Sequence, residues 1–149
     1  MAAVFVACEK AAPYDPVTQL EIDDAIIVKY LKDSAFTKHS SGLYYQIMRQ
    51  GTGNESYPET DTIFARYTLK VLKDTVLRDR FQDTTFKFVL SGYIDGWKTG
   101  TRLIQPGGAV RLIIPSALGF KDRPVTSPVI PPNSILDITL EIDKIKHPK

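Results

Sequence analysis

The sequence has little of what nucleophilic or metal-dependent catalysis requires. Its two histidines are His39, in a linker, and His147, in the C-terminal tail. Neither lies near a plausible nucleophile, so a Ser-His-Asp arrangement has little support. There is no HExxH, CxxC or phosphate-binding loop, and the single cysteine, Cys8, can form neither an internal disulfide nor a metal cluster. We therefore expect no metal and no cofactor.

Long hydrophobic runs and blocks of one charge are missing as well. No apolar stretch reaches the roughly 18 residues that a membrane-spanning helix needs. The formal net charge is only +2, and no cluster of Lys and Arg stands out, so nucleic acid is not expected as a partner. Hydrophobic residues make up 43% of the 149 residues, which is enough to build the core of one domain.

Residues 1–8 resemble the end of a bacterial lipoprotein signal. Small or apolar residues lead to Phe5-Val6-Ala7-Cys8, and Glu9-Lys10 follows at once. The resemblance implies a lipid on Cys8 and a location in the periplasm or at the outer membrane, with membrane contact through that lipid alone. No Lys or Arg precedes Cys8, and the apolar run is at the short limit for a secretory signal. An incidental cysteine in a cytoplasmic protein is the alternative.

A tether and one helix are expected in residues 9–40. Pro, Ala and polar residues at the start of this range are typical of a tether. Apolar residues at helical spacing then predict a helix from about Val17 to Lys32, and Thr18-x-x-Glu21 matches a capping box at its start.

Two adjacent carboxylates, Asp23 and Asp24, interrupt the apolar stripe of this helix. A metal site would need further ligands, and none has usable spacing. We therefore interpret the pair as part of a solvated helix face.

From Gly42 onward the hydrophobic period changes to two, which is typical of strands. The last strand is the clearest, with apolar residues alternating with Asp137, Thr139 and Glu141, so one sheet face should be buried and the other wet. The only helical segment here lies between Gly92 and Leu103, so the sheet must curl around it to bury its apolar face. The predicted fold is α+β: a curled, five- to six-stranded antiparallel half-barrel around one short helix, preceded by the N-terminal helix.

Three motifs then occur in the same order as in one known family. They are Tyr93-Ile94-Asp95-Gly96-Trp97, the run Gly107-Gly108-Ala109-Val110-Arg111-Leu112-Ile113-Ile114-Pro115, and Ile130-Pro131-Pro132-Asn133 leading to the last strand. From Gly42 to Lys146 the chain resembles the FKBP-type peptidyl-prolyl cis-trans isomerases. The resemblance implies a domain of that type at residues 41–149, in an envelope lipoprotein version.

The family likeness implies an apolar pocket that binds proline-containing polypeptides and rotates Xaa-Pro bonds, and that can take the macrolide inhibitors of the family. Trp97 would form its floor, with Phe120 on the loop above, and Tyr67 and Phe120 would act in catalysis. The remaining residues implied in substrate binding are Leu77, Phe86, Phe88, Tyr93, Ile94, Ile130 and Ile138.

The sequence departs from the family at three places, one of which is Lys121-Asp122, where a Gly usually follows the loop aromatic. The family has a Phe-Asp pair after the long strand, and counting from Tyr67 places Leu77 and Arg78 there; Asp79 could replace the Asp only if the loop adjusts. Phe120 stands where the family often has Tyr. A lost hydrogen bond is worth about 0.5–1.5 kcal/mol, so weak isomerase activity is expected. The alternative is a non-catalytic proline-peptide binding module or chaperone on the same fold.

Overall fold

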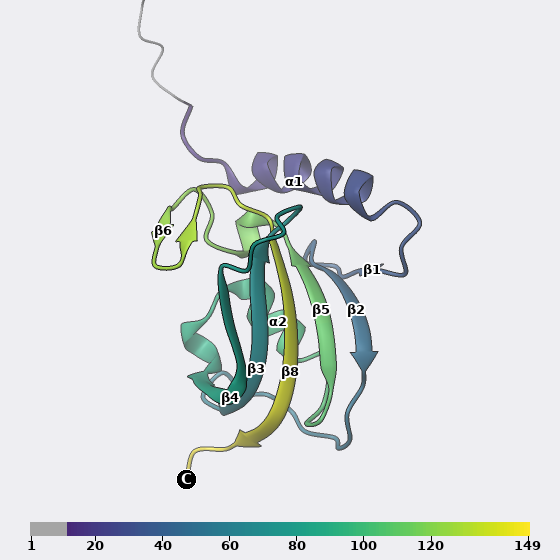
Figure 1. Cartoon of the computed structure of the whole chain (residues 1–149), viewed down its shortest axis with the longest axis vertical. Coiled ribbons are helices and arrows are strands. Elements are labelled where there is room, and N and C mark those ends of the chain that lie inside the picture. Colours follow the sequence, from purple (N-terminus) through teal and green to yellow (C-terminus); the bar gives the residue numbers. More distant parts are fainter. Residues whose placement is uncertain (1–11) are drawn as a thin grey trace, which may run out of the picture.

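The computed structural model describes residues 12–149, so Cys8 lies outside the described residues. One antiparallel sheet of six strands, in the order β1-β2-β5-β8-β3-β4, curls around a short helix (Figure 1). In chain order the elements are α1 (Pro16–Leu31), β1 (Thr37–Lys38), β2 (Tyr44–Arg49), β3 (Thr62–Val71), β4 (Asp79–Val89), the 3-10 turn η1 (Leu90–Gly92), α2 (Asp95–Thr101), β5 (Ala109–Ile114), the 3-10 turn η2 (Ser116–Leu118), β6 (Val125–Thr126), β7 (Val129–Ile130) and β8 (Leu136–Lys146). The predicted α+β class is confirmed.

The main core lies between the sheet and α2. Alternate residues of β3, β5 and β8 point to this side, and Trp97 of α2 is packed among them with 3% of its surface exposed. Glycines at positions 96 and 100 let the helix lie close on the sheet: a Cβ on Gly96 would meet Ile114, and one on Gly100 would meet Leu112. Because the helix backbone sits so near β5, the position of Trp97 is fixed by packing.

The pairing of β3 with β4 contains an irregularity that the sequence pattern did not predict. Ala65 pairs with Phe86, whereas Tyr67, two residues further along β3, pairs with Phe81. Two residues along β3 therefore correspond to five residues along β4. Such a bulge changes which side chains point inward, and it brings Phe81 to the same face as Phe86.

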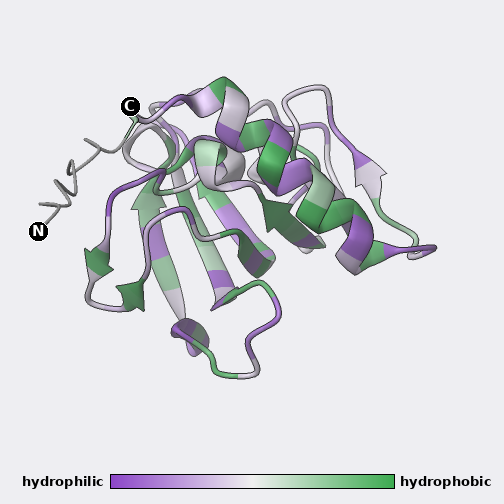
Figure 2. Cartoon of the chain, turned by 90° about the horizontal axis from the view of Figure 1, so that it is seen from above, coloured by the Kyte–Doolittle hydropathy of each residue, from purple (hydrophilic) through white to green (hydrophobic). Residues whose placement is uncertain are grey.

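Helix α1 lies across one end of the sheet on its outer side (Figures 1 and 2). Ile27 and Leu31 pack there against Tyr44, Ile113 and other residues in a second apolar cluster. The outer face was expected to be wet, and this part of it is not. Even Asp137 of β8 is 3% exposed, where it pairs with Arg111 at 2.7 Å.

The start of α1 also differs from the sequence prediction. The N-cap is Asp15, not Thr18, and its carboxylate accepts the backbone N–H groups of Val17 and Thr18 at 3.2 and 3.3 Å. Pro16 follows in the first turn, where its missing N–H costs nothing. The predicted extent of the helix is correct to one residue, whereas the predicted capping box is wrong.

The two aspartates of α1 do not form a solvated face, which corrects the interpretation from the sequence. Asp23 is 1% exposed and accepts both the backbone N–H of Ser116, at 2.6 Å, and its hydroxyl, at 2.5 Å. Asp24 accepts the hydroxyl of Tyr44 at 2.8 Å and pairs with Lys38 at 2.6 Å. Both carboxylates attach the helix to the domain.

Within residues 12–149, none of the helices has the length and apolar character needed to cross a membrane.

Candidate functional site

An apolar cavity of about 320 Å³ opens at the inner face of the sheet, beside α2. A volume of this size is at the lower end of the range for small-ligand sites. Side chains from β3, β4, α2 and the segment that follows β5 converge on it. The residues that line it are Tyr67, Leu69, Asp79, Phe81, Phe86, Gly92, Tyr93, Ile94, Trp97, Phe120, Pro128 and Ile130.

The indole of Trp97 is held in place by a ring of aromatic neighbours. Tyr67 meets it edge-on, with ring centroids 5.0 Å apart and planes at 81°. Tyr93 lies at 5.4 Å and Phe88 at 5.5 Å. Edge-to-face contacts of this kind favour particular ring orientations, so the indole offers a fixed apolar surface to whatever enters the cavity.

One polar pair stands at the edge of this apolar site. The hydroxyl of Tyr67 donates a hydrogen bond of 2.7 Å to the carboxylate of Asp79. Burial, and then the hydrogen bond to Asp79, raise the pKa of Tyr67 far above its ordinary value of 10.0. The tyrosine therefore remains a neutral hydrogen-bond donor at any physiological pH, and Asp79 fixes the direction of its hydroxyl.

The loop before β4 adjusts so that Asp79 reaches Tyr67, and this corrects two positions inferred from counting. Leu77 does not line the cavity, and 43% of its surface is exposed. Arg78 pairs instead with Asp74, at 2.5 Å. Sequence spacing alone could not place these residues, because the count back from Phe86 crosses the bulge in β4 and the count from Tyr67 crosses the turn between β3 and β4.

The other residues predicted for substrate binding fall into two groups. Those that line the cavity are Tyr67, Phe86, Tyr93, Ile94, Trp97, Phe120 and Ile130. Phe88 and Ile138 lie behind it in the core, with 4% and 0% of their surfaces exposed. They support the lining and do not form it.

Four lining residues were missed by the sequence interpretation: Leu69, Phe81, Gly92 and Pro128. Leu69 could have been predicted, since it lies two residues from Tyr67 on the same strand and must share its face. Phe81 was not, because it reaches this face only through the bulge. Pro128 belongs to the hairpin of β6 and β7, which forms part of the rim.

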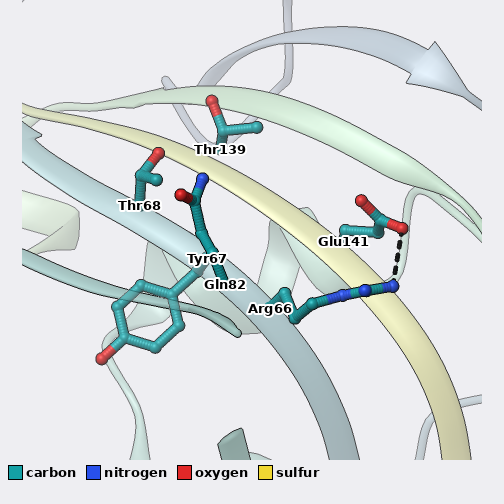
Figure 3. A pocket seen from close by; sticks show the side chains of 6 residues that line it. All are labelled: Arg66, Tyr67, Thr68, Gln82, Thr139 and Glu141. Atoms are coloured by element: carbon teal, nitrogen blue, oxygen red, sulfur yellow. Dashed lines mark hydrogen bonds and ion pairs between the residues drawn. The ribbon is translucent and has the colours of Figure 1, made fainter. Parts of the chain in front are cut away.

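A smaller hollow of about 180 Å³ lies on the opposite face of the sheet (Figure 3). Its side chains are polar, and Arg66 pairs with Glu141 at 3.0 Å and with Asp143 at 2.7 Å. The ring of Tyr67 turns away from these side chains, toward the other face (Figure 3). Polar side chains dominate this hollow, whereas aromatic and aliphatic side chains line most of the larger cavity, so the aromatic cavity is the candidate site.

No group of three or more His, Cys, Asp or Glu within residues 12–149 is arranged to hold a metal ion. What the cavity provides is an apolar, aromatic surface with one oriented hydroxyl.

A curled antiparallel sheet around one helix, with an aromatic cavity between them, is the architecture of a family that residues 53–143 match: the FKBP-type peptidyl-prolyl cis-trans isomerases. The chain belongs to this family. Its curated relatives include FkpA from Escherichia coli strain K12, which is 32% identical over 124 residues. FkpA from Buchnera aphidicola subsp. Schizaphis graminum is 31% identical over 120 residues.

The matched segment is 79% of this chain but 43% of the Escherichia coli protein, and 80% of this chain but 47% of the Buchnera protein. The chain thus spans less than half the length of these relatives.

Solved structures agree with the fold. The crystal structure of FkpA from Escherichia coli matches with a TM-score of 0.69 and 28% identity, covering 89% of this chain and 61% of that one. A peptidyl-prolyl cis-trans isomerase from Pseudomonas syringae matches with a TM-score of 0.74, covering 92% and 100% of the two chains. Its identity of 16% supports the fold alone. The family inferred from the motifs is confirmed.

Proposed function

We propose that this chain is a peptidyl-prolyl cis-trans isomerase that acts on Xaa-Pro bonds of polypeptides, assisting their folding. The observation that carries the proposal is the aromatic cavity floored by Trp97, with the Tyr67–Asp79 pair at its edge. Its volume suits a pyrrolidine ring and the adjoining peptide. Both chemical parts that the reaction needs, an apolar surface and an oriented polar group, are therefore in one place.

The mechanism requires no covalent intermediate. Rotation about the peptide bond must overcome a barrier of about 18–20 kcal/mol that arises from amide resonance. In the twisted state the amide has less charge separation than in either planar state, so a dry apolar cavity favours the twisted state. Binding that state more tightly than both planar states accelerates exchange in either direction.

The residues divide this work as follows. Trp97 would carry the proline ring, with Phe86, Ile94 and Ile130 against its sides, while the backbone of Tyr93 and Ile94 would bond the peptide. Phe120 would close the cavity from the loop above. It lacks the hydroxyl that the family often has there, so one hydrogen bond to the substrate is absent and activity should be weak.

A non-catalytic proline-peptide binding module or chaperone is the second candidate, and Phe120 is the observation that favours it. An NMR exchange measurement on a proline peptide, without a coupled protease, separates the two. We expect faster exchange between cis and trans peptide in the presence of the protein. If the peptide binds at saturating protein but its cis-trans exchange stays at the uncatalysed rate, only the binding module remains as a candidate.

Fluorescence tests the location of the site. Trp97 is the only tryptophan, so proline peptides or the family's macrolide inhibitors should change its emission on binding. A Trp97→Leu variant should bind the same peptides more weakly, as measured by calorimetry. Normal binding by that variant would show that the cavity is not the site.

We also propose a location and a domain organisation. Residues 41–149 would form the isomerase domain, residues 9–40 a tether and helix, and a lipid on Cys8 would attach the chain in the periplasm or at the outer membrane. The sequence around Cys8 supports this reading. Mass spectrometry of the protein from its host tests it, since a mass increase on the peptide that contains Cys8 is expected; an unmodified Cys8 would overturn the anchor.

A further inference from the structure

A second cavity continues from the aromatic site toward the rim. Its volume is about 460 Å³, and it shares Gly92, Tyr93, Ile94 and Phe120 with the first. Beyond Phe120 it is bordered by Lys121, Arg123 and Pro124, between η2 and β6, and by Val125 of β6. The two cavities therefore form one groove, and a peptide with its proline over Trp97 can extend past Phe120 into the second part.

The second cavity carries unbalanced positive charge. Lys121 and Arg123 both line it, and neither forms an ion pair with any carboxylate in residues 12–149. The carboxylate that also lines it, Asp95, is already paired with Lys98 at 3.4 Å. Asp122, between the two cations, lines a different hollow beside Tyr14. The charge that this part of the groove offers to a ligand is therefore cationic.

The backbone that carries these cations is held by hydrogen bonds. The N–H of Lys121 donates to the carbonyl of Ser116 at 2.9 Å, and its carbonyl accepts from Asn133 at 2.8 Å. The N–H of Arg123 donates to the carbonyl of Phe120 at 3.2 Å. Lys121 has a φ of 60°, a conformation that glycine adopts more readily. A lysine thus stands in a fixed turn where a glycine would fit more easily.

We propose that this second cavity is an anion-selective subsite, which favours proline peptides with an Asp or Glu side chain directly before or after the proline. The inference rests on the proposed function, because it needs the proline to sit over Trp97. Complementary charge at the edge of a binding site contributes to specificity and to the rate of encounter. Lys121 and Arg123 are then specificity-determining residues, and acidic segments near proline define the preferred substrates.

The test compares three peptides that differ only beside the proline, with Glu, Ala or Lys at the position before it in one series and after it in another. Affinity is measured from Trp97 emission, and exchange by NMR. We expect the Glu peptide to bind about fivefold more tightly than the Ala peptide in at least one series, as for partly exposed ion pairs, and the Lys peptide to bind more weakly than both. The preference should shrink as salt is raised.

Substitution of the cations provides the matched variants. Lys121→Gly removes the side chain without straining the turn, and the double variant Lys121→Gly with Arg123→Gln should bring the Glu-to-Ala ratio to about one. Lys32→Gly is the control, because Lys32 also has a positive φ, of 50°, but ends α1 on the outer side of the sheet. It should keep the wild-type ratio.

The outcomes separate this inference from the proposed function. Equal affinity for the three peptides in both series, or a ratio unchanged in the double variant, would overturn the subsite even if exchange is accelerated. A charge preference in binding without accelerated exchange would support the subsite and refute the isomerase. If none of the peptides binds, both are wrong.

Discussion

Tyr67 and Asp79 stand on neighbouring strands, and the hydrogen bond of 2.7 Å between them is the only polar contact between side chains that line the aromatic cavity. Because the site otherwise consists of apolar surfaces, the direction of this hydroxyl is the feature most sensitive to a single substitution.

Replacing Tyr67 with Phe should lower kcat/KM for proline peptides by about three- to tenfold. The variant keeps the ring against Trp97 and loses one hydrogen bond, which is worth about 0.5–1.5 kcal/mol. The NMR exchange rate, measured with one peptide at a series of concentrations, checks this. An unchanged kcat/KM would mean that the hydroxyl has no part in the reaction.

Tyr57→Phe is the matched control. The hydroxyl of Tyr57 is also buried, with its pKa raised to about 12 chiefly by burial, and it donates to the carbonyl of Ile104 at 2.7 Å. This tyrosine does not line the aromatic cavity. The control should lower the free energy of unfolding by about 1 kcal/mol and leave kcat/KM unchanged.

The sequence correctly predicted the site residues that belong to local motifs. It failed for residues whose position depends on how the strands pair. Trp97 was predicted because its glycine neighbour and its spacing in a short helix are local features. The roles of Asp79 and Phe81 depend on three-dimensional register, which a bulge alters without any signal in hydrophobic alternation. Leu77 was misplaced because it lies in the turn between β3 and β4, where a count from Tyr67 cannot tell which residues point to the cavity.

Among the elements, helix α1 is the one whose role the sequence least revealed. Its carboxylate Asp23 is buried against Ser116, which begins η2, and η2 leads directly to Phe120 and the rim of the groove. A helix outside the family match is therefore bonded to the turn that precedes the site. Two adjacent aspartates usually indicate a solvated face, so only the tertiary contact could reveal this attachment.

Asp23→Ala should lower the free energy of unfolding by about 2–4 kcal/mol. It leaves the backbone N–H and the hydroxyl of Ser116 buried without an acceptor, and each unsatisfied donor costs about 1–3 kcal/mol. Urea denaturation followed by circular dichroism gives the measurement.

Asp24→Ala provides the comparison on the same helix turn. The side chains of Asp24 and Lys38 are 32% and 49% exposed, so their ion pair contributes little, and the loss should be about 1 kcal/mol. If both variants lose equal stability, the burial of Asp23 is not what attaches the helix.

At the scale of the whole molecule, His147 in the C-terminal tail forms ion pairs with the segment before β3. Its Nδ1 lies 2.9 Å from Asp61 and its Nε2 lies 3.2 Å from Glu55. Asp61 is 1% exposed on its side chain, and His147 is its only ion-pair partner in residues 12–149. Asp61, and to a smaller extent Glu55, raise the pKa of His147 above its ordinary value of 6.5.

This contact predicts a pH dependence of stability. A raised pKa in the folded state means that folding favours the protonated ring. The stabilisation is fully present below about pH 6.5 and is lost as the pH rises through the folded-state pKa of His147. Denaturation of the wild type and of His147→Gln across this range should show a difference that is largest in acid and vanishes in base. A constant difference between the wild type and His147→Gln across this range would contradict the prediction.

The overall architecture was more predictable than these contacts. Period-two alternation in five segments, and one short helix, leave little choice but a curled antiparallel sheet. The order of the strands was not predicted, because alternation states which face a strand buries and says nothing about its neighbours.

That order has a consequence for biogenesis. β8, close to the C-terminus, lies between β5 and β3 and is hydrogen-bonded to both. Until residues 136–146 have left the ribosome, β3 with β4 and β5 with β2 are two separate pieces that lack their shared partner. Long-range pairing of this kind makes folding slow, so the two pieces stay without their shared partner, and open to proteases, until β8 pairs with both.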